Sequence, residues 1–316
     1  MTVVPMNLVP GARVLVVGAG GGFDFMCGLP IAIELEERGH PTFIASYSFT
    51  HLHAVRGGIW RTPGLLEVTP AAECDDDYFP ERHLSAWFAD VVGLERPIWC
   101  LGKGAVADTR ESLDYLVGQH GIDAVICVDG GVDGIFRGDE ADLGTPSMDS
   151  VTVLATHTCA AAQRLYACTA FGVEGAEGTV SHAQALERMA ELTAQGAFRG
   201  VGAIVPTDPV GQRFVDAARY VFSRTPPLRR SIIVSSMLAA LGGAHGRTAV
   251  HEKTRDRPPW ISLLTLLFWY FEADAVAKLK LFYEDALEAR TLGEVAEAIE
   301  RARTLAGVKP FVSIPI

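Results

Sequence analysis

Over the first 200 residues, short apolar runs alternate with longer segments of helical periodicity, and glycine or proline separates most of them. The apolar runs are rich in residues typical of buried strands; they lie at 13–17, 42–46, 96–100, 123–128 and 165–171. The helical segments lie at 24–38, 109–119, 146–162 and 182–195. Strands that alternate with helices predict a parallel sheet with right-handed crossovers.

After residue 201 the alternation weakens. Helices are predicted at 214–222, 231–241, 260–287 and 292–305. Residues 260–271 are apolar nearly all round, so we expect them to be buried in the fold or in a homodimer contact. Residues 49–80 show no clear element, which is typical of a lid or a binding loop.

These elements favour one compact α/β domain over residues 1–316 rather than two independent domains. We expect a Rossmann-like parallel sheet with helices on both faces. Residues 1–200 would form the sheet core, and residues 201–316 would add a mainly helical layer.

A glycine loop follows the first predicted strand. Gly20, Gly21 and Gly22 precede a helix, and such a loop can bind a phosphate or a carboxylate at the helix N-terminus. Asp24 either caps that helix or faces the ligand crevice. Phe23 occupies the third glycine position of the dinucleotide fingerprint, and residues 45–48 supply no acid for a ribose. NAD(P) is therefore disfavoured.

An acidic, glycine-rich segment follows the predicted strand at 123–128. Residues 129–149 contain six carboxylates, five glycines and one basic residue, Arg137. In open α/β sheets, ligands bind at the carboxyl ends of the strands. We expect Asp129 and Asp133 to act as acid and base or to hold a divalent cation, with support from Glu140.

Other residues of this segment are candidates for ligand contact. Gly130, Gly131 and Arg137 would line the site; the carboxylates could also accept hydrogen bonds from sugar hydroxyls. Asp149 lies in the first turn of the next predicted helix. The helix dipole stabilises a carboxylate at this position, which gives Asp149 a structural role and makes it the weakest catalytic candidate among the acids.

Two residues outside these loops complete the candidate site. Glu174 follows the strand predicted at 165–171 and could reach the same crevice. Arg247 lies in a second glycine-rich turn and is either an anion clamp or an ordinary surface arginine. The sequence has no G-x-S-x-G elbow, H-E-x-x-H helix or C-x-x-C pair.

Composition excludes several classes of protein. The chain is 49% apolar, which is typical of a globular protein and excludes disorder. A formal charge of −11 argues against nucleic acid as a partner. Because no signal peptide or membrane-spanning stretch is visible and the six cysteines are scattered, we expect a cytoplasmic protein with reduced thiols and no membrane partner.

The string VDGGVDGIFRGDEADLGTPSMD at 128–149 resembles the signature of the domain-of-unknown-function 1152 family. The opening VVGAGGGFDFMCGLPIAIELEERGH, the string FGVEG at 171–175, residues 231–246 and the tail PFVSIPI are similar to that family as well. The resemblance covers nearly the whole chain. It implies the fold and the location of the site, and it implies no reaction.

The sequence thus favours an enzyme that acts on a small polar metabolite bearing a phosphate, nucleotide or sugar group. Carboxylates would assist hydrolysis, group transfer or elimination. A nicotinamide- or flavin-linked oxidoreductase and a non-catalytic small-ligand-binding protein remain the alternatives.

Overall fold

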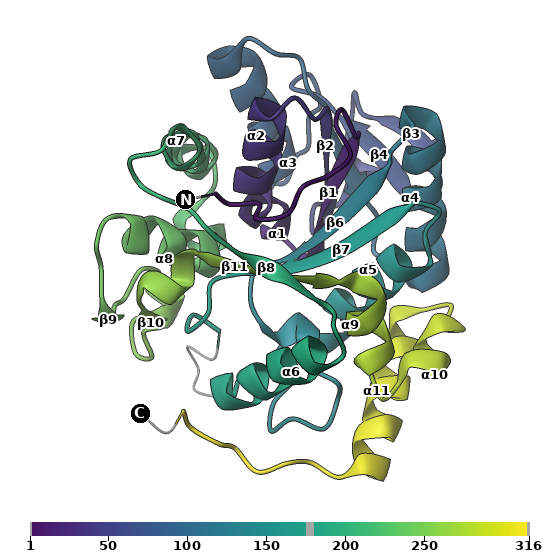
Figure 1. The fold of residues 1–316 in the computed structure, drawn as a ribbon. Helices are drawn as coiled ribbons and strands as arrows, with labels where there is room; N and C mark the ends of the chain where they lie inside the picture. Colours follow the sequence, from purple (N-terminus) through teal and green to yellow (C-terminus); the bar gives the residue numbers. More distant parts are fainter. Residues whose placement is uncertain (1, 175–179, 315–316) are drawn as a thin grey trace.

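In a computed structural model, which describes residues 2–174 and 180–314, nine strands form one sheet (Figure 1). In spatial order they are β3 (Ile59–Thr62), β4 (Leu65–Val68), β5 (Ile98–Leu101), β2 (Thr42–Tyr47), β1 (Val14–Gly21), β6 (Ala124–Asp129), β7 (Gln163–Cys168), β11 (Leu267–Glu272) and β8 (Phe198–Ala203). A separate two-stranded ribbon pairs β9 (Gly246–Arg247) with β10 (Trp260–Ile261).

The middle of the sheet is parallel. Strands β5, β2, β1, β6 and β7 run in one direction, and β1 pairs with β2 and β6 on its two sides. Val14 lies opposite both Thr42 and Ala124. The predicted parallel arrangement of residues 13–17, 42–46 and 123–128 is therefore confirmed, and the fold is α/β and Rossmann-like.

Helices cover both faces of the sheet, as predicted. Alternate residues of β1 face opposite ways: Val14 and Val16 lie in one buried cluster, and Leu15 and Val17 in the other. The first face carries α1 (Asp24–Cys27), α2 (Leu29–Glu37), α3 (Pro80–Trp87), α7 (Pro209–Ser223) and α8 (Ile232–Leu241). The second carries α4 (Val106–His120), α5 (Pro146–Thr158), α6 (His182–Ala194), α9 (Ala273–Leu279), α10 (Tyr283–Leu287) and α11 (Leu292–Ala306).

The prediction of helix throughout residues 260–287 is wrong in its first half. This stretch forms β10, a 3₁₀ turn and β11 before α9 begins. Strand β11 is antiparallel to both of its neighbours, β7 and β8, and its side chains are buried on both faces of the sheet. Phe268 and Tyr270 pack on one face and Phe271 on the other. A strand buried on both faces is apolar at every position, and its pattern is indistinguishable from that of a buried helix.

The hydrophobic pattern does not predict three further strands, β3, β4 and β8. Residues 49–80, predicted to be irregular, contain the hairpin of β3 and β4 at the edge of the sheet. Each of these strands has four residues, and β3 is largely exposed, so neither shows an apolar run. Strand β8 spans residue 200. Together with β11 it continues the sheet past the predicted end of the sheet core.

Within the described ranges, no helix is both long enough and apolar enough to span a membrane.

The burial of Phe268 in β11 can be tested by truncating its side chain. Phe268 is fully buried, whereas Leu263, five residues earlier, is 79% exposed. We expect Phe268→Ala to lower the free energy of unfolding by about 3–5 kcal/mol and Leu263→Ala to change it by less than about 0.5 kcal/mol. Urea unfolding followed by circular dichroism measures the free energy of unfolding of both variants. Equal effects would contradict the burial of Phe268.

Candidate functional site

The strand order changes direction between β1 and β6. The chain leaves β1 through α1 and α2 on one face, and it enters β6 from α4 on the other face. Such a switch point opens a crevice at the carboxyl ends of the two strands, where α/β proteins bind ligands. The glycine loop and the acidic segment both begin at this crevice, as the sequence predicts.

The glycine loop is packed closely by side chains of the protein itself. The Gly20 amide donates to Asp24 Oδ2 at 2.8 Å. A Cβ atom on Gly20 would lie 2.1 Å from Asp149 Oδ1, and one on Gly21 would lie 1.6 Å from Cε1 of Phe49. Glycine is therefore required at both positions, because two carboxylates and an aromatic ring contact the backbone there.

Asp24 does not act as a helix cap. Phe23 occupies the N-cap position of α1, and the Asp24 carboxylate accepts the Gly20 amide instead. A Cβ atom on Gly130 would lie 2.5 Å from Asp24 Oδ1, so this carboxylate also contacts the start of the acidic segment. Of the two readings of Asp24 from sequence, the structure supports the one that places it in the crevice.

Asp129 organises the acidic segment. Its Oδ1 accepts the amide of Gly131 at 2.9 Å, and its Oδ2 accepts the amide of Gly134 at 2.9 Å and the hydroxyl of Tyr166 at 2.6 Å. A buried carboxylate with three donors is stabilised in place. Asp129 therefore fixes the conformation of the turn that follows β6.

Glu174 and Asp133 meet beside Asp129. Glu174 Oε2 accepts the amides of Val132 and Asp133, the latter at 3.1 Å, and Asp133 Oδ2 accepts the amide of Thr145 at 2.9 Å. One carboxylate oxygen each from Asp129, Asp133 and Glu174 lie within 4.8 Å of one another. Oxygen ligands at this separation can hold a divalent cation.

Two more carboxylates, those of Asp24 and Asp149, approach this group, and we call the five the acidic cluster: Asp24, Asp129, Asp133, Asp149 and Glu174. Asp149 lies in the first turn of α5 and accepts the hydroxyl of Thr145 at 2.9 Å. The sequence ranks Asp149 as the weakest of the acids, yet the structure places it against Gly20. Helix α5 turns it towards the crevice.

One buried cation faces the cluster, and sequence reasoning missed it. Lys280 follows α9; its Nζ donates to the carbonyl oxygens of Gly134 at 2.9 Å and Phe136 at 3.1 Å. Burial lowers the pKa of Lys280, whereas the charge of Asp149 and its neighbours opposes that shift. Lys280 alternates with Lys278 in an otherwise apolar stretch, and this pattern does not show which of the two lysines is buried.

Burial also shifts the pKa values of the carboxyl groups upwards. It raises the pKa of Asp129 to about 7, and the charge of Asp133 contributes to this shift. Burial together with the neighbouring acids raises the pKa values of Asp24, Asp149 and Glu174 in the same direction. These four carboxyl groups therefore bind protons at pH values where exposed carboxylates are ionised.

A comparison with family models identifies the chain. The model of the family described as protein of unknown function (DUF1152) matches residues 86–308. The chain belongs to the DUF1152 family. This range contains Asp129, Asp133, Asp149 and Glu174, and the glycine loop lies before it. No curated protein and no solved structure gives a significant match to the chain.

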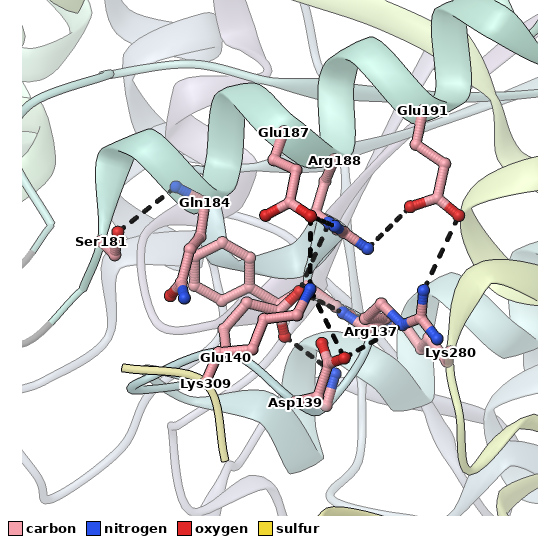
Figure 2. Close-up of polar contacts among 12 residues, drawn as sticks. Arg137, Asp139, Glu140, Ser181, Gln184, Glu187, Arg188, Glu191, Lys280 and Lys309 are labelled. Atoms are coloured by element: carbon pink, nitrogen blue, oxygen red, sulfur yellow. Dashed lines mark hydrogen bonds and ion pairs between the residues drawn. The ribbon is translucent and has the colours of Figure 1, made fainter. Parts of the chain in front are cut away.

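Two of the predicted site residues lie elsewhere in this DUF1152 protein. Glu140 accepts the amides of Arg137 at 3.1 Å and Gly138 at 2.9 Å, and it lies 3.7 Å from the buried guanidinium of Arg188 on α6. Arg137 pairs with Asp139 and Glu191. Figure 2 shows both residues in a network of charges beneath α6. They fasten the acidic segment to α6, and the structure does not bring them to the acidic cluster.

Arg247 lines a pocket of about 580 Å³ beside the cluster of the DUF1152 protein. Glu174 lines the same pocket, so the pocket reaches the cluster at that carboxylate. Phe171, His182 and Trp260 form other parts of its wall, and the sequence gives no pattern that would single them out. A cavity of this size accommodates a small metabolite.

The contact between Gly131 and Glu174 allows a test of the loop geometry. A Cβ atom on Gly131 would lie 1.9 Å from Glu174 Cδ. We expect Gly131→Ala to lower the free energy of unfolding by about 1–3 kcal/mol, because the carboxylate must move. Gly118 in α4 has no atom near an added Cβ, so Gly118→Ala serves as the control and should stabilise the protein by up to about 1 kcal/mol in urea unfolding. Equal effects would contradict the close packing.

The raised pKa of Asp129 predicts a pH dependence of stability. Between the usual carboxyl pKa and about 7, native Asp129 holds a proton that the unfolded chain has released. Stability from this group is therefore present at low pH and is lost as pH rises through about 7. From pH 5 to 7, we expect the wild type to lose up to about 1.4 kcal/mol per pH unit relative to Asp129→Asn, and no more above about pH 8, where Asp129 is ionised in both the native and the unfolded state.

Urea unfolding of both proteins in EDTA, at a series of pH values, measures this difference. The ionisable groups outside the acidic cluster are common to both proteins, so their contribution cancels. Parallel stability curves for the two proteins would show that Asp129 is ionised throughout this range.

Proposed function

We propose that this protein is an enzyme that uses a divalent cation, held by Asp129, Asp133 and Glu174, to act on a small polar metabolite bearing a phosphate, nucleotide or sugar group. The observation that carries the proposal is the position of Glu174. Its carboxylate belongs both to the group whose oxygens lie within 4.8 Å of one another and to the wall of the 580 Å³ pocket. A ligand in the pocket would therefore lie beside the cation.

The charge balance of the cluster supports a cation. Five carboxylates gather where Lys280 supplies a single buried ammonium group. Like charges at these separations repel strongly in a low-dielectric site, and either protons or a metal ion must neutralise them. Oxygen donors favour Mg²⁺, Mn²⁺ and Ca²⁺ over softer ions.

The residues around the pocket suit a phosphate-bearing substrate. Arg247 can pair with an anionic group, and a cation at Glu174 would bind the same group from the other side. A bound divalent cation would hold Asp129 in its carboxylate form, so Asp129 would act as a ligand of the cation rather than as an acid or a base. This division of roles fits hydrolysis, group transfer or elimination at the phosphate or sugar.

NAD(P) stays disfavoured as a cofactor in this proposal, because side chains of the protein contact the glycine loop. The Gly20 amide is engaged by Asp24, and Phe49 covers Gly21. Strand β2 ends at Tyr47 rather than at an acid. A pyrophosphate would have to displace both side chains to reach the loop.

Isothermal titration with MnCl₂ tests the cation site. We expect one Mn²⁺ to bind the wild type, and we expect Asp133→Asn and Glu174→Gln to weaken binding by at least about tenfold. Asp256→Asn is the matched control, because it removes the same charge from an exposed carboxylate. It should bind Mn²⁺ like the wild type. Absence of binding at millimolar Mn²⁺ would contradict the cation site.

Turnover tests the reaction. Sugar phosphates and nucleotides, assayed with and without Mn²⁺, should include a substrate whose conversion EDTA abolishes. Asp129→Asn should then reduce its turnover by about 10²-fold or more. Full activity in EDTA, or in Asp129→Asn, would overturn the assigned roles.

A further inference from the structure

A second cavity lies on the opposite side of the glycine loop from the 580 Å³ pocket. It is a groove of about 680 Å³ at the carboxyl ends of β2 and β5, beside the edge strand β3. Ser48, Thr50, His53, Trp60 and Lys103 contribute to its lining. Its size falls within the range of small-molecule sites. Most of its residues come from the segment 49–80, which the cation site leaves without a role.

The groove contains a stacked aromatic pair. The rings of His53 and Trp60 lie 5.0 Å apart between centroids and 22° from parallel. Trp60 is 38% exposed although it belongs to a strand, so part of the indole remains open to a ligand. Stacked planar side chains of this kind bind heterocyclic bases through their faces.

The groove is locally positive in a chain whose formal charge is −11. Lys103 is exposed, and its Nζ lies 4.9 Å from the centroid of the Phe49 ring. None of the described residues that line the groove is acidic. These features suit a phosphate group.

A buried carboxylate holds the floor of the groove in place. Glu81 on α3 accepts the hydroxyls of Ser46 at 2.9 Å and Thr50 at 3.0 Å. The Ser48 hydroxyl in turn accepts the Thr50 amide at 3.1 Å. The segment after β2 is therefore fixed before a ligand arrives, which reduces the entropy that binding costs.

Phe49 connects the groove to the acidic cluster. Its ring packs against Gly21 and lies beneath Lys103. A phosphate at Lys103 thus lies next to the glycine loop, whose Gly20 contacts Asp24 and Asp149 of the cluster.

We infer that this groove binds a nucleoside monophosphate, with the base stacked at His53 and Trp60 and the phosphate at Lys103. The single lysine matches one phosphate rather than a chain of three. The nucleotide's role as a substrate rests on the function proposed above, whereas its binding rests on the groove alone.

Titration with AMP in EDTA tests the inference without involving the cation. We expect AMP to bind, and we expect adenosine and ribose 5-phosphate, which each lack half of the ligand, to bind more weakly. Trp60→Leu should weaken AMP binding by about tenfold or more, and Lys103→Gln by about three- to tenfold. Both side chains are exposed, so these variants should keep the fold.

Two matched variants locate the ligand. Trp260 is 51% exposed in the other pocket, and Lys278 is an exposed lysine on α9. Trp260→Leu and Lys278→Gln should leave AMP binding unchanged. Loss of binding in Trp260→Leu but not in Trp60→Leu would overturn the inference, as would ribose 5-phosphate binding as tightly as AMP, or no AMP binding at millimolar concentration.

The two proposals can fail separately. If AMP binds the groove and Mn²⁺ does not bind, the proposed cation site is wrong and the groove is still a nucleotide site. If Mn²⁺ binds and AMP does not, the nucleotide assignment of the groove is wrong and the cation site is unaffected.

Discussion

The hydrogen bonds of Asp129 are the interaction on which the candidate site depends. One carboxylate at the end of β6 accepts two loop amides and a tyrosine hydroxyl, and this fixes the turn from Gly130 to Gly134. The turn then presents the amides of Val132 and Asp133 to Glu174, and it presents the Gly134 carbonyl to Lys280. Side chains from β6, from the segment after β7 and from the end of α9 are thereby brought to one place.

This arrangement carries an electrostatic cost. Backbone amides stabilise carboxylates, but they do not cancel the repulsion among five of them. The raised pKa values of Asp24, Asp129, Asp149 and Glu174 express that repulsion together with burial. A site that must take up either protons or a cation is poorly optimised for stability. Such sites are found where the chemistry requires the charge.

Sequence reasoning placed the glycine loop and the acidic segment at one edge of the sheet because it relied on topology. Alternating strands and helices predict a parallel sheet, and a parallel sheet places the segments after 13–17 and 123–128 at one edge. Reasoning by residue type within the acidic segment was less successful. Glu140 and Arg137 resemble site residues in sequence, yet they lie in the network with Arg188, a partner 48 residues later in the chain that no local pattern reveals. The aromatic groove depends on Trp60 of the edge strand β3, which has four residues and is too short and too exposed to give a signal.

Strand β11 has a consequence for the order in which the chain can assemble. It lies between β7 and β8 and is hydrogen-bonded to both, although it follows β8 by more than sixty residues in sequence. During synthesis from the N-terminus, β8 therefore emerges with no neighbour in the sheet, and the edge of β7 stays open until residue 272 leaves the ribosome. Long-range pairing of this kind slows folding and exposes strand edges to other chains in the meantime. The last step of sheet formation also places Lys280, eight residues beyond β11, against the acidic cluster, so completion of the sheet and completion of the site coincide.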